Sequence, residues 1–320
     1  MNTDRMAASI TVLIDAARKN PTGLCYEISS LENSIKQIIN ARSTLRLVLP
    51  AFHGKSPLRA WTVSDLPDYG DALAARNLLE LRGRIADIYP HTWLYLISEG
   101  HLYGDVELLG DDVAVDAYLD KVRAMFAGNN GVSVVDVSEL LPPASRQRQR
   151  QALLDLYCPA EIEMRQMLVE PRYLQLYKSY AKLNQRLLKT AHNCQSFYGA
   201  PVGEVISRSA RDRRGKELAL LQLRKYVGFA KLIVHSYGPE PYIKLSPLYK
   251  EPGDIGIGIN LIAGNHQRAT PSFYSMCQDG GGSYRFIKAA SAREAGLILI
   301  DNDGLPLFVE PTRGIAHAVV

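Results

Sequence analysis

Two short polar segments carry side chains that could transfer protons and bind an anion. The segments are PAFHGKSPLRAW (50–61) and SEGHLYGD (98–105). In the first segment, the cations of Lys55 and Arg59 and the hydroxyl of Ser56 suit a phosphate or a carboxylate. This composition indicates a small-molecule site that handles an anionic substrate.

The second segment holds the best candidate for proton transfer. His101 is the candidate because histidine is the residue type suited to acid–base chemistry near neutral pH, and Glu99 or Asp105 could orient its imidazole. Ser98 begins the segment and adds a hydroxyl. Spacing alone leaves a second interpretation open, in which both segments are ordinary solvated loops between strands and helices.

Apolar runs before and after these segments predict the elements that position them. TLRLVLP (44–50), TWLYLIS (92–98) and GVSVVDVS (131–138) have the length of buried strands. Residues 69–89 and 111–128, which lie between these strands in the sequence, have apolar residues at helical spacing. This alternation predicts βαβ units and a parallel sheet. Because ligands bind at the carboxyl ends of such strands, the two polar segments should share one crevice if their strands are neighbours.

The whole pattern predicts an α/β protein with a Rossmann-like, mostly parallel central sheet and flanking helices. We expect an α/β core in 1–143, a helical region in 144–240, and a β-rich C-terminal part in 241–320 that completes the fold. In the last part, GLILI and LPLFV predict a hairpin with the four-residue connection DNDG (301–304).

Composition excludes several classes of protein. The chain has 320 residues, of which 47% are hydrophobic and 22% charged, as in ordinary globular proteins. A net charge of +4 is too mild to favour nucleic-acid binding. The sequence shows no membrane-length apolar run and no secretory leader, so we expect a cytoplasmic protein with no membrane partner. Four cysteines form no CxxC pair, which argues against a zinc ribbon: Cys25, Cys158, Cys194 and Cys277.

Two basic runs lie in the predicted helical region. RSARDRRGKELALL (208–221) places Arg214 and Lys216 at a helix start, where cations oppose the macrodipole. This misfit favours anion binding, and a solvated helix start is the alternative. SRQRQRQ (145–151) is interpreted as a solvated surface.

The motifs together resemble the isonitrile synthase family, often labelled pyoverdine/dityrosine biosynthesis proteins. LRLVLPAFHGKSPLRAW (45–61) is similar to a family strand that ends in Pro-Ala-Phe and Lys-Ser-Pro. LYLISEGHLYGDV (94–106) is similar to the family's Ser-Asp-Gly segment. An Arg-Gly-Lys helix start (214–216) and YIKLSPLY (242–249) follow in the family's order, so the resemblance spans about residues 20–310.

The resemblance implies a specific reaction. Family members condense the amino group of an amino acid, often tyrosine or tryptophan, with the C2 ketone of ribulose 5-phosphate. That carbon becomes the isonitrile carbon, with loss of phosphate and cleavage of the sugar. The resemblance implies no metal and no organic cofactor, and small molecules as partners. We also expect that the chain could form a homodimer.

Site roles follow from the motifs and the resemblance together. The residues expected to be catalytic are His101, Asp105, Lys55 and Glu99. The residues expected to bind substrate or phosphate are Ser56, Arg59, Ser98, Arg214, Lys216, Lys244 and Ser246.

The sequence also departs from the family pattern. Glu99 stands where Asp is usual, Pro247 and Leu248 stand where Ile-His is usual, and TPSFYS (270–275) replaces Thr-Pro-Trp-His. Two histidines of the pattern are thus replaced. Two alternatives therefore accompany the leading interpretation: a diverged family member that makes another N-modified product, and a non-catalytic binding protein.

Overall fold

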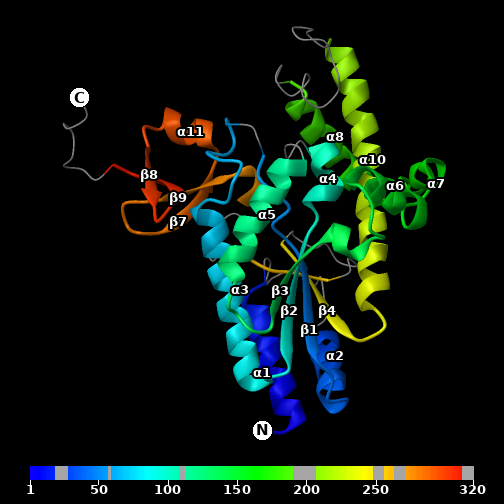
Figure 1. Cartoon of the computed structure of the whole chain (residues 1–320), viewed down its shortest axis with the longest axis vertical. Helices are drawn as coiled ribbons and strands as arrows, with labels where there is room; N and C mark the ends of the chain where they lie inside the picture. The colour runs from blue at the N-terminus through cyan, green and yellow to red at the C-terminus, as the bar shows by residue number, and fades with distance from the viewer. Residues whose placement is uncertain are drawn as a thin grey trace. The chain divides into compact units, whose positions relative to one another are not determined.

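The computed structural model describes most of the chain, which folds as two compact units; Figure 1 labels most of their helices and strands. The described residues are 1–18, 28–56, 59–107, 112–189, 207–247, 256–262 and 271–311. The side chains of residues 104, 105 and 107 also lie outside the described part, and with them the carboxylate of Asp105, a predicted catalytic group.

Each unit gathers segments that are far apart in the sequence. We name the first the sheet unit: Met1–Glu99, Asp116–Val135 and Glu240–Val320. We name the second the helical unit: Gly100–Val115 and Asp136–Pro239. The division of the chain into three parts, 1–143, 144–240 and 241–320, stays a prediction from the sequence.

A five-stranded parallel sheet organises the sheet unit and confirms the predicted α/β class. Its strands are β1 (Leu45–Pro50), β2 (Thr92–Ser98), β3 (Val132–Asp136), β4 (Tyr242–Ser246) and β5 (Ile257–Gly258). The strand order is β3-β2-β1-β4-β5, and β1 pairs in parallel with both β2 and β4. After β1, the chain therefore adds β2 and β3 on one side of β1, and it later adds β4 and β5 on the other side. In sheets of this Rossmann-like order, ligands bind where the order reverses, beyond the carboxyl ends of β1 and β4.

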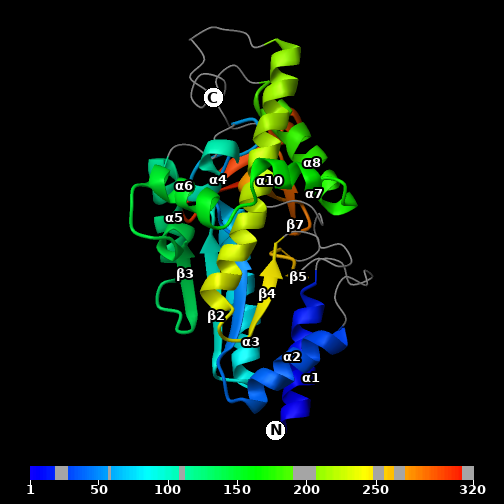
Figure 2. The same cartoon turned by 90° about the vertical axis from the view of Figure 1, so that its right-hand side faces the viewer.

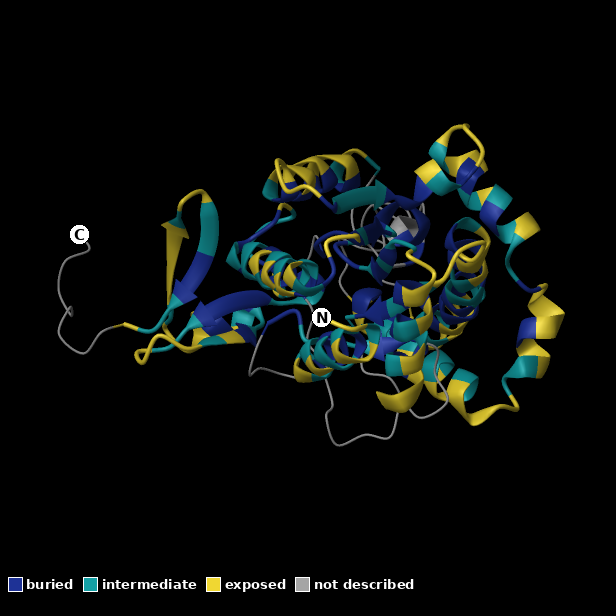
Figure 3. Cartoon of the chain, turned by 90° about the horizontal axis from the view of Figure 1, so that it is seen from below, coloured by how far each residue is buried: buried dark blue, intermediate teal, exposed yellow. Residues whose placement is uncertain are grey.

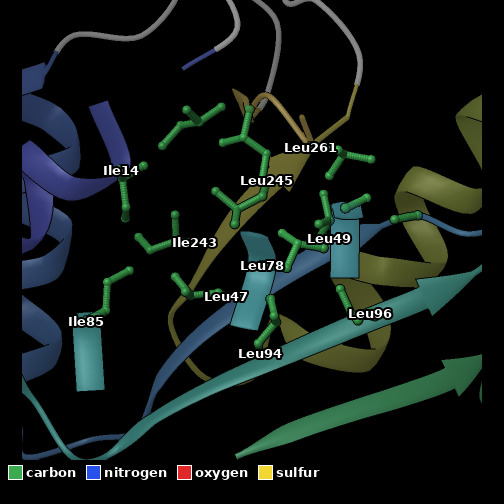
Figure 4. Packing of buried hydrophobic residues seen from close by; sticks show 14 of the residues in the cluster. Ile14, Leu47, Leu49, Leu78, Ile85, Leu94, Leu96, Ile243, Leu245 and Leu261 are labelled. Atoms are coloured by element: carbon green, nitrogen blue, oxygen red, sulfur yellow. The ribbon is translucent and has the colours of Figure 1, made fainter. Parts of the chain in front are cut away.

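Helices and strands of the sheet unit share one apolar core. The helices concerned are α1 (Thr3–Ala16), α2 (Ile28–Asn40), α3 (Tyr69–Ile88) and the later part of α5 (Asp112–Phe126). Figure 4 shows Ile14 and Leu78 facing Leu47 of β1 and Leu245 of β4, all buried. Burying one such aliphatic side chain contributes about 1.5–3 kcal/mol. The side chain of Asp68 accepts from the Gly70 backbone N–H and helps to start α3 at the edge of this core.

The end of the chain forms a second, four-stranded sheet. Its elements are β6 (Ser275–Gln278), β7 (Tyr284–Ile287), α11 (Ala289–Glu294), β8 (Ile298–Asn302) and β9 (Leu305–Val309). The predicted hairpin is confirmed as β8 and β9, but the four-residue connection is wrong. Pairing continues to Asn302 and Leu305, so only Asp303 and Gly304 remain, with φ of 56° and 81°. Two successive positive φ values match a type I′ turn, the tight turn that suits strand twist.

The helical unit contains the helical region predicted from the sequence. Its elements are α4 (Gly100–Glu107), the 3-10 turn η1 (Val137–Leu140), α6 (Arg146–Leu156), α7 (Glu161–Met167), α8 (Pro171–Leu187) and α10 (Arg208–Tyr237). Figure 2 shows α10 as the longest of these helices. Pro171 occupies the first turn of α8, where its missing N–H costs nothing. Figure 3 shows buried and exposed residues striping the helices, as amphipathic packing requires.

Within the part of the chain that the structure describes, no helix combines the length and apolarity needed to cross a membrane.

Gly228 lets α10 approach the segment after α6, and its replacement tests that packing. A Cβ at Gly228 would lie 2.3 Å from the Sγ and 3.1 Å from the backbone N of Cys158. We expect Gly228→Ala to lower the free energy of unfolding by about 1–3 kcal/mol in urea titrations, because the site has no room.

The matched control is Gly83→Ala in α3, where an added Cβ would meet no atom within 4 Å. That variant should gain about 0.5–1 kcal/mol, since alanine favours a helix interior. Equal changes in the two variants would contradict the proposed close approach.

Candidate functional site

The loop after β1 begins with backbone angles that are costly for ordinary residues. Phe52 has φ of 59° and Gly54 has φ of 125°, with His53 between them. Positive φ at a bulky residue is rare, and such strain is concentrated at functional sites. The Ser98 hydroxyl at the end of β2 donates to the Phe52 carbonyl at 2.9 Å. The first two strands are thus neighbours, and a hydrogen bond joins their carboxyl ends.

Lys55 lies in this loop with its ammonium fully buried. Its Nζ is 2.8 Å from Asp68 Oδ2 and 2.9 Å from Asp71 Oδ2. It also donates to the Pro271 carbonyl at 2.7 Å. Tyr118 completes the cluster by donating to Asp71 Oδ1 at 2.7 Å. The ammonium therefore ties together the β1 loop, the start of α3 and the segment before β6, while anion binding by Lys55 stays a prediction.

Burial and ion pairing have opposite effects on the pKa values of Asp68 and Lys55. Burial raises the pKa of Asp68 to about 7, although the Lys55 ammonium opposes that change. Burial lowers the pKa of Lys55, but Asp68 and Asp71 outweigh it and raise the value overall. Burial also lowers the pKa of His53 to about 4, so its imidazole is neutral at physiological pH. The cluster can therefore hold an extra proton on Asp68 near neutrality.

The other predicted residues of the sheet unit differ in their exposure. Ser56 is buried, and its backbone N–H donates to the Ser272 carbonyl at 2.8 Å. Ser246 is buried at the carboxyl end of β4, beside β1 in the sheet. Arg59 is exposed and pairs with Asp65 at 3.3 Å. Two further predicted residues are half-buried, one after β2 and one on β4: Glu99 and Lys244. Ser246 thus lies at the carboxyl edge of the sheet, Ser56 lies in the loop after β1, and Arg59 lies at the surface.

The helical unit contains a buried histidine–carboxylate pair. His101 is the second residue of α4, and its Nδ1 lies 2.6 Å from Oδ2 of Asp136, the last residue of β3. Their exposed fractions are each 2%. Burial alone raises the pKa of Asp136, but hydrogen bonds from His101 and Ser138 outweigh it and lower the value overall. The ionised carboxylate must accept, so Nδ1 donates and Nε2 is the basic nitrogen. This is the arrangement of a general acid–base pair.

Asp136 was not anticipated as the partner of His101. The sequence pointed to Glu99 or Asp105, and those two pairings stay predictions. The structure places Asp136, which lies 35 residues further along the chain, in hydrogen-bond contact with His101. A signal was present, because Asp136 lies near the end of the predicted strand 131–138, and side chains at the carboxyl edge of a parallel sheet meet.

The interpretation of 145–151 as a solvated surface is wrong for one face of α6. Gln149 is buried and donates to the Ser138 carbonyl at 2.9 Å. Arg146 lies 3.6 Å from Asp136 Oδ1 and also donates to the Ser138 hydroxyl. Arg150 is half-buried and pairs with Asp112 at 2.8 Å. The spacing of 146, 149 and 150 places these residues on one helical face.

Arg214 and Lys216 are exposed on α10, also in the helical unit. Arg214 pairs with Glu217, one turn away, at 3.1 Å. The described contacts are those of a solvated helix start, and anion binding by Arg214 and Lys216 stays a prediction. Among the residues with described coordinates, no group of three or more His, Cys, Asp or Glu is arranged to hold a metal ion.

Comparison with known proteins identifies relatives along most of the chain. A sequence model of the family described as "Pyoverdine/dityrosine biosynthesis protein" matches residues 35–300. An L-tyrosine isonitrile synthase of Pseudomonas aeruginosa is 25% identical over 296 residues, covering 89% of this chain and 85% of that protein. An L-tryptophan isonitrile synthase of Fischerella ambigua is 22% identical over 304 residues, covering 90% and 83%. The crystal structure of the PvcA protein from Pseudomonas aeruginosa has a TM-score of 0.79 at 20% identity, covering 96% of this chain and 100% of that one. That structure has the same fold.

Asp68→Asn should change how stability depends on pH. The folded-state pKa of Asp68 is about 7 against an ordinary value of 3.8, so the folded protein keeps a proton that the unfolded chain releases. The stabilisation is complete below about pH 4 and is lost as the pH rises through about 7. In urea titrations over this range, wild type should lose up to about 1.4 kcal/mol per pH unit relative to the variant.

His53 titrates in both proteins and cancels in this comparison. The control is Asp65→Asn, at an exposed carboxylate that pairs with Arg59. A wild-type difference from Asp68→Asn that stays constant with pH would contradict the assignment of the proton to Asp68.

Proposed function

Because the chain belongs to the pyoverdine/dityrosine biosynthesis protein family, we propose that it is a biosynthetic enzyme that forms an isonitrile. In this proposal the amino group of an amino acid condenses with the C2 ketone of ribulose 5-phosphate. Support comes from two relatives named as isonitrile synthases for L-tyrosine and L-tryptophan, each aligned over most of both chains. The partners are small molecules, no organic cofactor takes part, and the reaction takes place in the cytoplasm.

The hydrogen bond between His101 and Asp136 is the observation that carries the proposal. Imine formation needs a proton donor when water leaves, and the later sugar cleavage and phosphate loss need a base. A histidine can serve both steps when a carboxylate holds one nitrogen, because the other nitrogen can then take or give a proton. The Asp136 carboxylate, 2.6 Å from Nδ1, meets this requirement.

The remaining site roles are part of the same proposal. His101 is the acid–base group and Asp136 orients it, while Glu99 and Asp105 are further catalytic candidates. Lys55 organises the β1 loop through Asp68 and Asp71. Substrate and phosphate contacts are assigned, as in the sequence-based prediction, to Ser56, Arg59, Ser98, Arg214, Lys216, Lys244 and Ser246.

One observation favours a second candidate, a family member that makes another N-modified product. The segment TPSFYS stands where the family pattern has Thr-Pro-Trp-His, so the segment itself supplies no imidazole. Its carbonyls at Pro271 and Tyr274 accept from Lys55 at 2.7 Å and 3.5 Å. The segment thus contacts Lys55 through its backbone and lacks the histidine of the family pattern.

Isotopic labelling distinguishes the two candidates. Purified protein is incubated with ribulose 5-phosphate labelled at C2 and a panel of amino acids, and products are analysed by mass spectrometry. We expect the label in an isonitrile with L-tyrosine or L-tryptophan. Label in a different N-modified product would support the second candidate, and no labelled amino-acid product across the panel would contradict both.

His101→Asn should lower kcat by about 10²–10⁴-fold, because general acid–base catalysis contributes on that order. Asparagine retains part of the shape and hydrogen bonding, so the folded structure should persist. The matched control is His235→Asn, an exposed histidine on α10, which should turn over like wild type. A His101→Asn rate within a few-fold of wild type would shift the acid–base role to Glu99 or Asp105.

A further inference from the structure

We propose that Arg150 and Lys225 are positioning residues that hold the first turn of α4 so that the imidazole of His101 meets Asp136. The inference rests on the proposed function, since it assigns His101 as the acid–base group. All the contacts used here lie within the helical unit. Neither cation belongs to a motif of the family resemblance.

Arg150 fixes the backbone of the catalytic histidine itself. Its Nη1 donates to the His101 carbonyl at 3.1 Å and to Asp112 Oδ1 at 2.8 Å. Its Nη2 contacts Asp112 Oδ2 at 3.2 Å, so the ion pair is bidentate. A bidentate guanidinium has little rotational freedom, and its remaining donors point in defined directions. The His101 carbonyl is therefore held at a defined point relative to α6.

Lys225 holds the next carbonyl from a different helix. Its Nζ donates to the Leu102 carbonyl at 2.7 Å, and the side chain has an exposed fraction of 0%. Lys225 lies on α10, one turn after the buried Gln222. Two successive carbonyls of α4 are thus held by cations from α6 and α10. With two fixed points, rotation and sliding of the first turn of α4 are both restrained.

The same helix also holds the partner of His101. One turn before Arg150, Arg146 lies 3.6 Å from Asp136 Oδ1, and Gln149 donates to the Ser138 carbonyl at 2.9 Å. The N–H of Ser138 in turn donates to Asp136 Oδ1 at 2.7 Å. One face of α6 therefore contacts both sides of the His101–Asp136 hydrogen bond. The rigid spacing of a helix sets the separation of the two groups.

Stability alone does not account for two cations at this place. Removing a charged group from water costs several kcal/mol, and an apolar side chain could fill a buried position without that cost. The first turn of a helix is also the positive end of its dipole, where cations are disfavoured. A requirement for accurate placement explains both features, because a catalytic group displaced by about 1 Å can lose about 100-fold in rate.

The test uses Arg150→Gln and Lys225→Met, which remove the charge and keep much of the side-chain volume. Arg148→Gln is the matched control, because Arg148 lies on the exposed face of the same helix. A conservative variant, Arg150→Lys, retains the charge and one donor. The whole chain is used, with L-tyrosine and ribulose 5-phosphate as substrates.

Two readouts are measured for each variant. The first is the downfield proton resonance of the His101–Asp136 hydrogen bond, which reports its geometry without turnover. The second is the separation of kcat from KM. We expect Arg150→Gln and Lys225→Met to shift or abolish the resonance and to lower kcat by about 100-fold, with KM changed less than about threefold. Arg150→Lys should recover part of the rate, and Arg148→Gln should match wild type.

Several results would overturn the inference. One is an unchanged resonance in both charge-removing variants, and another is a wild-type protein that lacks the resonance. A lower melting temperature with kcat intact would also overturn it, because that combination indicates support of the fold alone. If no variant or wild-type protein turns over any substrate, the proposed function fails, and the resonance still decides the positioning role.

Discussion

A buried ammonium must be surrounded by oxygen atoms, and this requirement at Lys55 determines how the sheet unit is joined. The Lys55 Nζ contacts Asp68, Asp71 and the Pro271 carbonyl, which come from segments far apart in the chain. The strained β1 loop, the start of α3 and the approach to β6 must therefore meet at one point. Removing the Lys55 ammonium would leave the two buried carboxylates without this cation, and an uncompensated buried charge typically costs about 3–5 kcal/mol.

Two buried charged clusters in the described part of the chain differ in their electrostatics. Around Lys55, the buried carboxylates of Asp68 and Asp71 contact the same ammonium, and burial raises the pKa of Asp68 to about 7. At His101, hydrogen bonds keep Asp136 ionised despite burial, and the pair has a defined direction for proton transfer. The contacts of Lys55 join three segments of the sheet unit, and the role of the His101–Asp136 pair in proton transfer belongs to the proposed function.

This chain shares its fold with PvcA, but its sequence departs from the family pattern in a segment that contacts Lys55. The match to PvcA has a TM-score of 0.79 at 20% identity, so the fold is shared despite extensive substitution. The segment TPSFYS contacts Lys55 through its backbone carbonyls, although it lacks the histidine of the family pattern. Backbone carbonyls are present whatever the side chain, so the attachment can persist while the chemistry at that position changes.

The sequence by itself determined the local elements and the edge of the sheet where the site should lie. Apolar periodicity reports burial one segment at a time, which is why β1, β2 and α3 appear where the pattern predicts them. Only the tertiary structure decided which groups meet. Asp136 lies 35 residues from His101, Arg150 lies 49 residues away, and Pro271 lies 216 residues from Lys55. Such pairings depend on the packing of distant segments, and no local pattern encodes that packing.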